Sequence, residues 1–119
     1  MKKGSQEDGI VYHAGFPNAA EDDHTTAMSL DGLIVKNRAS TYFWRLESGI
    51  DELQWRPGSI VVVDRALSPR SGRYIVIVVN DAFIIGRFGD KGFYALDGTL
   101  QDGDSQLWGV VTFVIQDLQ

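Results

Sequence analysis

The chain has 119 residues, 44% of them hydrophobic and 23% charged, and it carries a net charge of −5. This composition is typical of one small globular domain and excludes a largely disordered chain. Cysteine is absent, so disulfide scaffolds, thiolate metal sites and cysteine nucleophiles are excluded. With only two histidines, His13 and His24, we expect no metal site and no cofactor. No apolar run reaches the roughly 20 residues of a membrane span and no secretory segment opens the chain, so we expect a cytoplasmic protein without a membrane partner.

Acidic residues outnumber basic residues, 16 to 11, which is the opposite of the balance on a nucleic-acid-binding surface. The arginines lie scattered among acidic residues, as on a mixed, solvated surface. Only Arg65, Arg70 and Arg73 lie close enough in sequence to form a local basic patch. We therefore expect no direct binding of nucleic acid.

The N-terminal part of the chain is polar and acidic, and glycines and a proline interrupt it. We expect a flexible N-terminal arm over residues 1–27, followed by a single domain over residues 28–119. Within the arm, residues 9–12 have the apolar and aromatic character of an edge strand. Ser29 begins the one helical candidate, which runs through Val35, because its hydroxyl can accept a hydrogen bond from a backbone N–H two or three residues on.

Most of the remaining chain has the character of β-strands. β-Branched and aromatic runs predict strands at 41–46, 59–64, 74–79, 82–85, 93–96 and 108–115. Asn80-Asp81 lies between two of these runs and predicts a tight hairpin, because both residue types tolerate a positive φ. We therefore predict a mainly β fold, namely a compact, antiparallel, barrel-like domain with one short helix.

Few residues outside this framework carry a chemistry of their own. Ser48 follows the aromatic strand, where a serine is most simply a turn residue that bonds to nearby backbone. Asp102 and Asp104 flank a glycine as in a fragment of a calcium loop, but the other ligands of such a loop are missing, and a turn explains them better. We interpret the three tryptophans as core or subunit-contact residues.

The order of several motifs is nevertheless specific. Ala14-Gly15-Phe16-Pro17 is similar to the cleavage-site region of UmuD-type proteins, which carry Cys-Gly or Ala-Gly followed by Phe-Pro. Further motifs follow in the order and spacing of that family: Ser40-Thr41-Tyr42-Phe43, residues 57–64, residues 71–76, the Asn80-Asp81 hairpin and Trp108-Gly109-Val110-Val111. Over residues 14–115 the chain thus resembles the LexA/UmuD family of self-cleaving serine–lysine peptidases. The resemblance implies the mostly β fold of that peptidase domain, and it implies that Ala14 and Gly15 form the cleavage site.

In that family a serine attacks a peptide carbonyl, and a lysine kept neutral by burial removes the proton of the serine. The resemblance places the serine at Ser48 or on Gly49, in a loop shorter than that of the family. It places the lysine at Gly86, and glycine offers no base. Arg87 beside it cannot substitute, because a guanidinium does not deprotonate in proteins. The resemblance therefore implies that the catalytic lysine is missing.

Three functions are compatible with these observations. The leading interpretation is a catalytically degenerate UmuD-like protein that acts by protein–protein binding in the SOS response to DNA damage and in mutagenesis. The partners that the resemblance implies are a second copy in a homodimer, a UmuD-type subunit, a UmuC-like translesion polymerase and the RecA filament. One alternative is an active self-cleaving peptidase with Ser48 as nucleophile and a base elsewhere, although the family pattern places neither Lys36 nor Lys91 beside it. The other alternative is a mobile-element regulator that retains only the fold.

Overall fold

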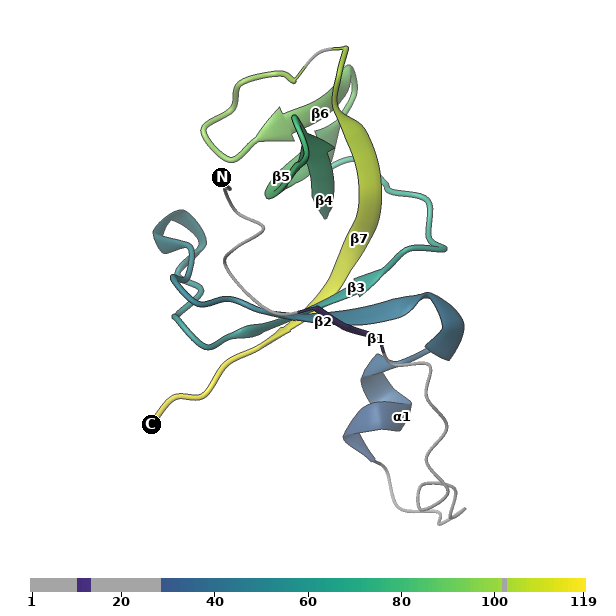
Figure 1. The fold of residues 1–119 in the computed structure, drawn as a ribbon, viewed down its shortest axis with the longest axis vertical. Coiled ribbons are helices and arrows are strands. Elements are labelled where there is room, and N and C mark those ends of the chain that lie inside the picture. Colours follow the sequence, from purple (N-terminus) through teal and green to yellow (C-terminus); the bar gives the residue numbers. More distant parts are fainter. Residues whose placement is uncertain (1–10, 14–28, 102) are drawn as a thin grey trace.

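The computed structural model of the chain describes residues 11–13, 29–101 and 103–119 (Figure 1). This part of the chain forms one seven-stranded sheet in the order β1-β2-β3-β7-β4-β5-β6. Every neighbouring pair is antiparallel. The strands are β1 (Val11–His13), β2 (Thr41–Arg45), β3 (Ile60–Asp64), β4 (Tyr74–Val79), β5 (Ala82–Gly89), β6 (Gly92–Ala95) and β7 (Gln106–Ile115). The predicted mainly β, antiparallel fold is confirmed.

Of the segment predicted as an N-terminal arm, the structure describes residues 11–13. These residues form β1, which pairs with β2 at one edge of the sheet, so the predicted edge strand is confirmed within a residue or two. The other residues of the predicted arm, including Ala14 and Gly15, lie outside the described residues.

The longest strand, β7, joins two halves of the sheet. Its residues 110–115 pair with β3, and its residues 106–110 pair with β4. The register shifts in both ladders, between Val62 and Val63 and between Val76 and Ile77, and such bulges bend a sheet. As a result β7 arches from β3 to β4 in Figure 1. The sheet is therefore a curled one with edges at β1 and β6, and the predicted barrel-like shape does not close.

Local signals in the sequence explain the turn and the helix. Asn80 and Asp81 both have a positive φ, 53° and 67°, and they connect β4 to β5 as predicted. The helix α1 (Leu30–Ile34) begins after Ser29, whose Oγ accepts a hydrogen bond from the Gly32 N–H at 3.0 Å. Short 3-10 turns at 38–40 and 51–53 complete the regular structure of the described part.

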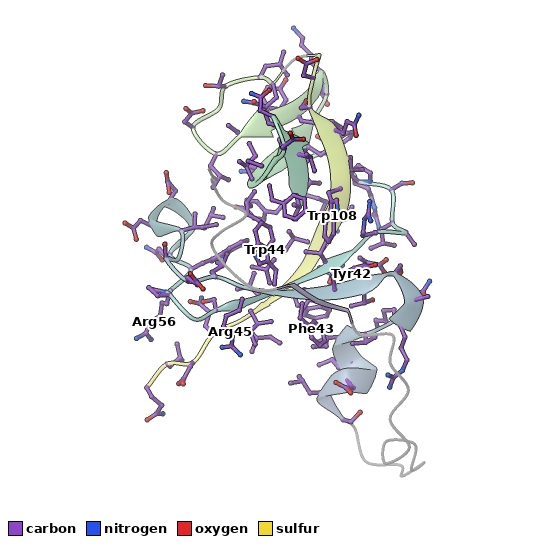
Figure 2. All side chains as sticks on the ribbon, viewed as in Figure 1. Tyr42, Phe43, Trp44, Arg45, Arg56 and Trp108 are labelled. Carbon is purple, nitrogen blue, oxygen red and sulfur yellow. The ribbon has the colours of Figure 1, made fainter. Side chains whose placement is uncertain are left out.

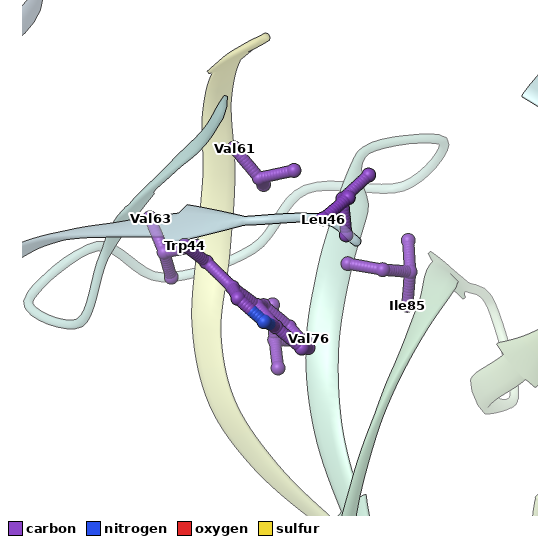
Figure 3. Close-up of a cluster of buried hydrophobic side chains, with 6 residues drawn as sticks. All are labelled: Trp44, Leu46, Val61, Val63, Val76 and Ile85. Carbon is purple, nitrogen blue, oxygen red and sulfur yellow. The ribbon is translucent and has the colours of Figure 1, made fainter. Parts of the chain in front are cut away.

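Two hydrophobic clusters lie on opposite faces of the β4–β5 ladder, because successive side chains of a strand alternate. The first cluster contains the buried residues Trp44, Leu46, Val61, Val63, Val76 and Ile85 (Figure 3). It therefore combines residues of β2 and β3 with residues of β4 and β5. The second cluster is centred on Ile75, Ile77 and Val110. The curl of the sheet thus lets one layer of strands enclose a core.

Candidate functional site

The loop after β2 contains the predicted nucleophile position. Ser48 is exposed, in a bend between β2 and the turn at 51–53. The loop closes tightly behind it, because Ile50 and Trp55 exchange backbone hydrogen bonds of 2.8 and 3.1 Å. Gly49 has a φ of 76°, and a Cβ atom there would lie 2.7 Å from the Trp55 carbonyl oxygen. Position 49 therefore accepts only glycine, which leaves Ser48 as the one hydroxyl among the two positions that the resemblance indicates.

The position predicted for the missing lysine is closed. Gly86 is buried in β5, between Ile75 on β4 and Ala95 on β6. A Cβ atom there would overlap the carbonyl oxygen of Tyr94 and lie 3.4 Å from its carbonyl carbon, and the nearest side-chain atom would be Ile77 Cδ1 at 3.6 Å. The obstacle is backbone in a paired strand, which cannot move aside by changing a rotamer. As described, this site has no space for any side chain.

The residues next to the two predicted site positions belong to different clusters. Leu46, just before the serine loop, packs in the first cluster together with Ile85. A side chain at residue 86 would point instead toward Ile77, which belongs to the second cluster. A base placed at residue 86 would thus project away from the face that Leu46 covers.

The structure also shows the surroundings of three other basic residues, Lys36, Lys91 and Arg87. Lys36 and Lys91 are exposed. The Arg87 guanidinium lies 5.2 Å from the centroid of the Tyr74 ring, and its Nη2 donates to the Gly72 carbonyl oxygen at 3.2 Å. Among the residues that the structure describes, no cluster of histidine and carboxylate side chains could hold a metal ion.

An aromatic cluster that contains two of the three tryptophans joins the halves of the sheet. The Trp108 ring lies 5.2 Å from Tyr42 and 5.0 Å from Phe83, and Phe83 meets Trp44 edge-on at 5.6 Å. Figure 2 shows Trp44 and Trp108 between the halves. Arg65 stacks over Trp108 at 4.5 Å and donates from Nε to its carbonyl oxygen at 2.8 Å. Aromatic contacts of this kind add about 0.5–1.5 kcal/mol beyond the area they bury.

The structure divides the arginine patch that the sequence indicated. Arg65 is engaged with Trp108, whereas Arg70 and Arg73 line a cavity of about 250 Å³ beside β7. A second cavity, of about 270 Å³, adjoins the first and also includes Arg73. Both cavities lie where β7 leaves β4, so they depend on strand pairing and had no signal in the sequence.

The mainly β fold and the order of motifs along the chain resemble those of UmuD-type proteins. No protein-family model matches the chain. It is 28% identical to Protein MucA of Salmonella typhimurium in an alignment 113 residues long, and this alignment covers 83% of this chain and 75% of MucA. It is 29% identical to Protein SamA of Salmonella typhimurium strain LT2 over 109 residues, covering 86% of this chain and 78% of SamA. Protein ImpA of Escherichia coli is 28% identical over 111 residues, with 86% and 77% covered.

The similarity to these relatives extends over most of each chain. In the described part of the chain, no helix has the length and apolar character to cross a membrane.

Proposed function

We propose that this chain is a catalytically degenerate UmuD-like protein that acts by binding other proteins in SOS-type mutagenesis. The observation that carries the proposal is the closed backbone at Gly86, where the Tyr94 carbonyl leaves no space for a lysine side chain. A serine without a nearby base is a poor nucleophile at neutral pH. Removal of one member of a catalytic unit lowers hydrolase rates by about 10⁴ to 10⁶. A slow self-cleavage reaction would then be lost.

The proposed binding partners are a second copy of the chain, a UmuD-type subunit, a UmuC-like polymerase and the RecA filament. An open strand edge supports the homodimer. Residues 111–115 of β7 pair with β3 on one side only, since β4 pairs with β7 no further than Val110. Open edges pair readily with another strand, and two-fold dimers are the commonest oligomers.

Incubation of the purified chain at alkaline pH, and separately with activated RecA, tests the loss of self-cleavage. Intact mass spectrometry should show the full chain, with no fragment ending at Ala14 and no new terminus at Gly15. A Ser48→Ala variant should give the same spectrum. A fragment that forms in the original chain and disappears in Ser48→Ala would restore the peptidase interpretation.

Light scattering at tens of micromolar tests the proposed homodimer. The expected mass is twice that of the chain, and it should fall toward the mass of one chain on dilution. A single-chain mass throughout this range would contradict the dimer and leave the conclusion about catalysis untouched.

A further inference from the structure

A tight turn between β3 and β4 holds two arginines close together. The Arg73 N–H donates to the Arg70 carbonyl oxygen at 3.0 Å, which closes a β-turn, and the Cα atoms at the ends of such a turn lie within about 7 Å of each other. Gly72, the third residue of the turn, has the positive φ, 89°, that this place in a type II turn requires. Phe88 of β5 fixes the turn, since its carbonyl oxygen accepts from the Gly72 N–H at 2.8 Å and its N–H donates to the Arg73 carbonyl oxygen at 2.9 Å. The backbone therefore sets the positions of both arginines in advance.

The cavity that these arginines line is suited to an oxyanion. It measures about 250 Å³ and lies beside β7, and Ser68 adds a hydroxyl group to its lining. Within the part of the chain that the structure describes, neither the Arg70 nor the Arg73 guanidinium has a hydrogen bond or an ion pair. None of the described residues lining the cavity is acidic, and Asp64 at the end of β3 already accepts hydrogen bonds from other groups. A guanidinium binds a phosphate through paired hydrogen bonds, and a phosphate between two guanidinium groups removes the repulsion between their charges.

The adjoining cavity supplies an aromatic wall. It measures about 270 Å³, shares Arg73 with the first cavity, and is lined by the half-buried rings of Trp55 and Tyr74. These rings meet edge-on at 5.6 Å, and the Arg87 guanidinium lies 5.2 Å from the Tyr74 ring, so both rings are held by neighbours. Small-molecule sites commonly measure roughly 300–1,000 Å³, which means that a ligand of that kind would span both cavities. Such a ligand would carry an anionic group joined to a planar, apolar ring.

We propose that the two cavities form one binding site for a free nucleoside monophosphate. Arg70 and Arg73 bind its phosphate, and its base lies against Trp55 and Tyr74. Every nucleobase has a π-face that stacks on aromatic side chains. The net charge of −5 opposes a long nucleic acid strand, which repeats its phosphate at every nucleotide, whereas a single nucleotide needs one cationic site. The proposal depends neither on the loss of self-cleavage nor on the homodimer.

An NMR titration of the ¹⁵N-labelled full chain tests the site with three compounds: adenosine monophosphate, inorganic phosphate and adenosine. Adenosine monophosphate should shift the indole N–H signal of Trp55 and the backbone signals of Arg70 and Arg73. The indole signal of Trp44 is the internal control and should not move, because Trp44 is buried and lines neither cavity. Inorganic phosphate and adenosine should each bind at least about fivefold more weakly than the nucleotide, since each makes only half of the contacts. All titrations use one protein concentration, so that any dimer is present equally.

Three variants locate the phosphate. R70A and R73A should each weaken the binding of adenosine monophosphate by about tenfold or more, because hydrogen bonds between charged groups are lost. Arg45→Ala is the matched control, because Arg45 is exposed on β2, lines neither cavity, and removes the same charge. That variant should bind the nucleotide like the original chain. Circular dichroism checks that each variant is folded.

The remaining outcomes would overturn the proposal. A Trp55 signal that stays unmoved at millimolar adenosine monophosphate would show that no nucleotide binds against this ring. Equal affinities for the nucleotide and for inorganic phosphate would show an anion site only and remove the role of the aromatic wall. Equal affinities of R73A and Arg45→Ala would place the nucleotide elsewhere. None of these outcomes would alter the conclusions about self-cleavage or the dimer, which the mass spectrometry and light scattering above test separately.

Discussion

Replacement of Gly86 by alanine tests whether the lysine position is closed. The change adds one methyl group in the middle of β5, where the residue is buried and paired on both sides. The added carbon would overlap the Tyr94 carbonyl oxygen of β6. Alanine itself is compatible with a strand, so the collision is the only new cost. Gly86→Lys begins with the same Cβ and should meet the same obstacle.

The size of the effect follows from the kind of atom that is struck. Extra methylene groups in a packed core cost about 1–3 kcal/mol. The neighbour here is the backbone of a hydrogen-bonded strand, so either β6 moves or the β5–β6 ladder distorts. We therefore expect a loss near the upper end, about 2–3 kcal/mol. A typical domain has a free energy of unfolding of about 5–15 kcal/mol, so this loss is a large share of the total.

Urea unfolding followed by tryptophan fluorescence measures the loss. With a slope of about 1–3 kcal/mol per molar urea, the midpoint should fall by about 1 M or more. Gly103→Ala is the control, because Gly103 is exposed and an added Cβ would meet no atom within 4 Å. That variant should match or slightly exceed the original stability. Equal midpoints for Gly86→Ala and Gly103→Ala would refute the reasoning, and the position could then accept a lysine.

Three further outcomes follow from local contacts. Asn80→Val should lower the free energy of unfolding by about 1–2 kcal/mol, because φ at this position is 53°. Asn80→Gly should not lower the free energy of unfolding. Equal urea midpoints for the two variants would contradict this prediction. Ser40→Ala should lower the free energy of unfolding by about 1.5–3 kcal/mol in the same assay, because the Ser40 hydroxyl donates to the buried Asp64 carboxylate at 2.6 Å. A free energy of unfolding that is unchanged within error would show that water replaces the hydroxyl as the donor. The Asp97 carboxyl accepts a hydrogen bond from the Thr99 backbone N–H, which lowers its pKa, so its titration followed by NMR should have a midpoint below that of an ordinary exposed aspartate. A depressed pKa stabilises the fold above the ordinary aspartate pKa, and that small contribution disappears as the pH falls through the lowered value.

The strands, the hairpin and the helix could be predicted because each depends on residues that are neighbours in sequence. Asn80-Asp81 marks the β4–β5 turn since these side chains tolerate the φ values that the turn needs. Ser29 marks the start of α1 because its hydroxyl reaches an N–H within the first turn of the helix. Which side chains of the helix are buried depends on the tertiary structure, in which Ile34 is buried while Leu30 and Leu33 are exposed.

The positions of the candidate site stay predictions from the motif order, which places the serine at Ser48 or Gly49 and the missing lysine at Gly86. That the backbone of β6 has closed over Gly86 was not visible, because the obstructing Tyr94 carbonyl belongs to a different strand. The assignments of Ala14 and Gly15 as a cleavage site stay predictions, as both lie outside the described residues.

By itself, the sequence determined which segments are strands, where they turn and which family they resemble, because alternation, turn residues and motif order act over a few residues at a time. Only the tertiary structure decided which strands pair and what surrounds each side chain. Arg65, Arg70 and Arg73 look equivalent in sequence, yet Arg65 stacks on Trp108 whereas Arg70 and Arg73 line the cavity beside β7. The cavity exists because β7 pairs with β3 and β4 over different stretches, and pairing between strands distant in the chain is set by how the whole sheet buries its core.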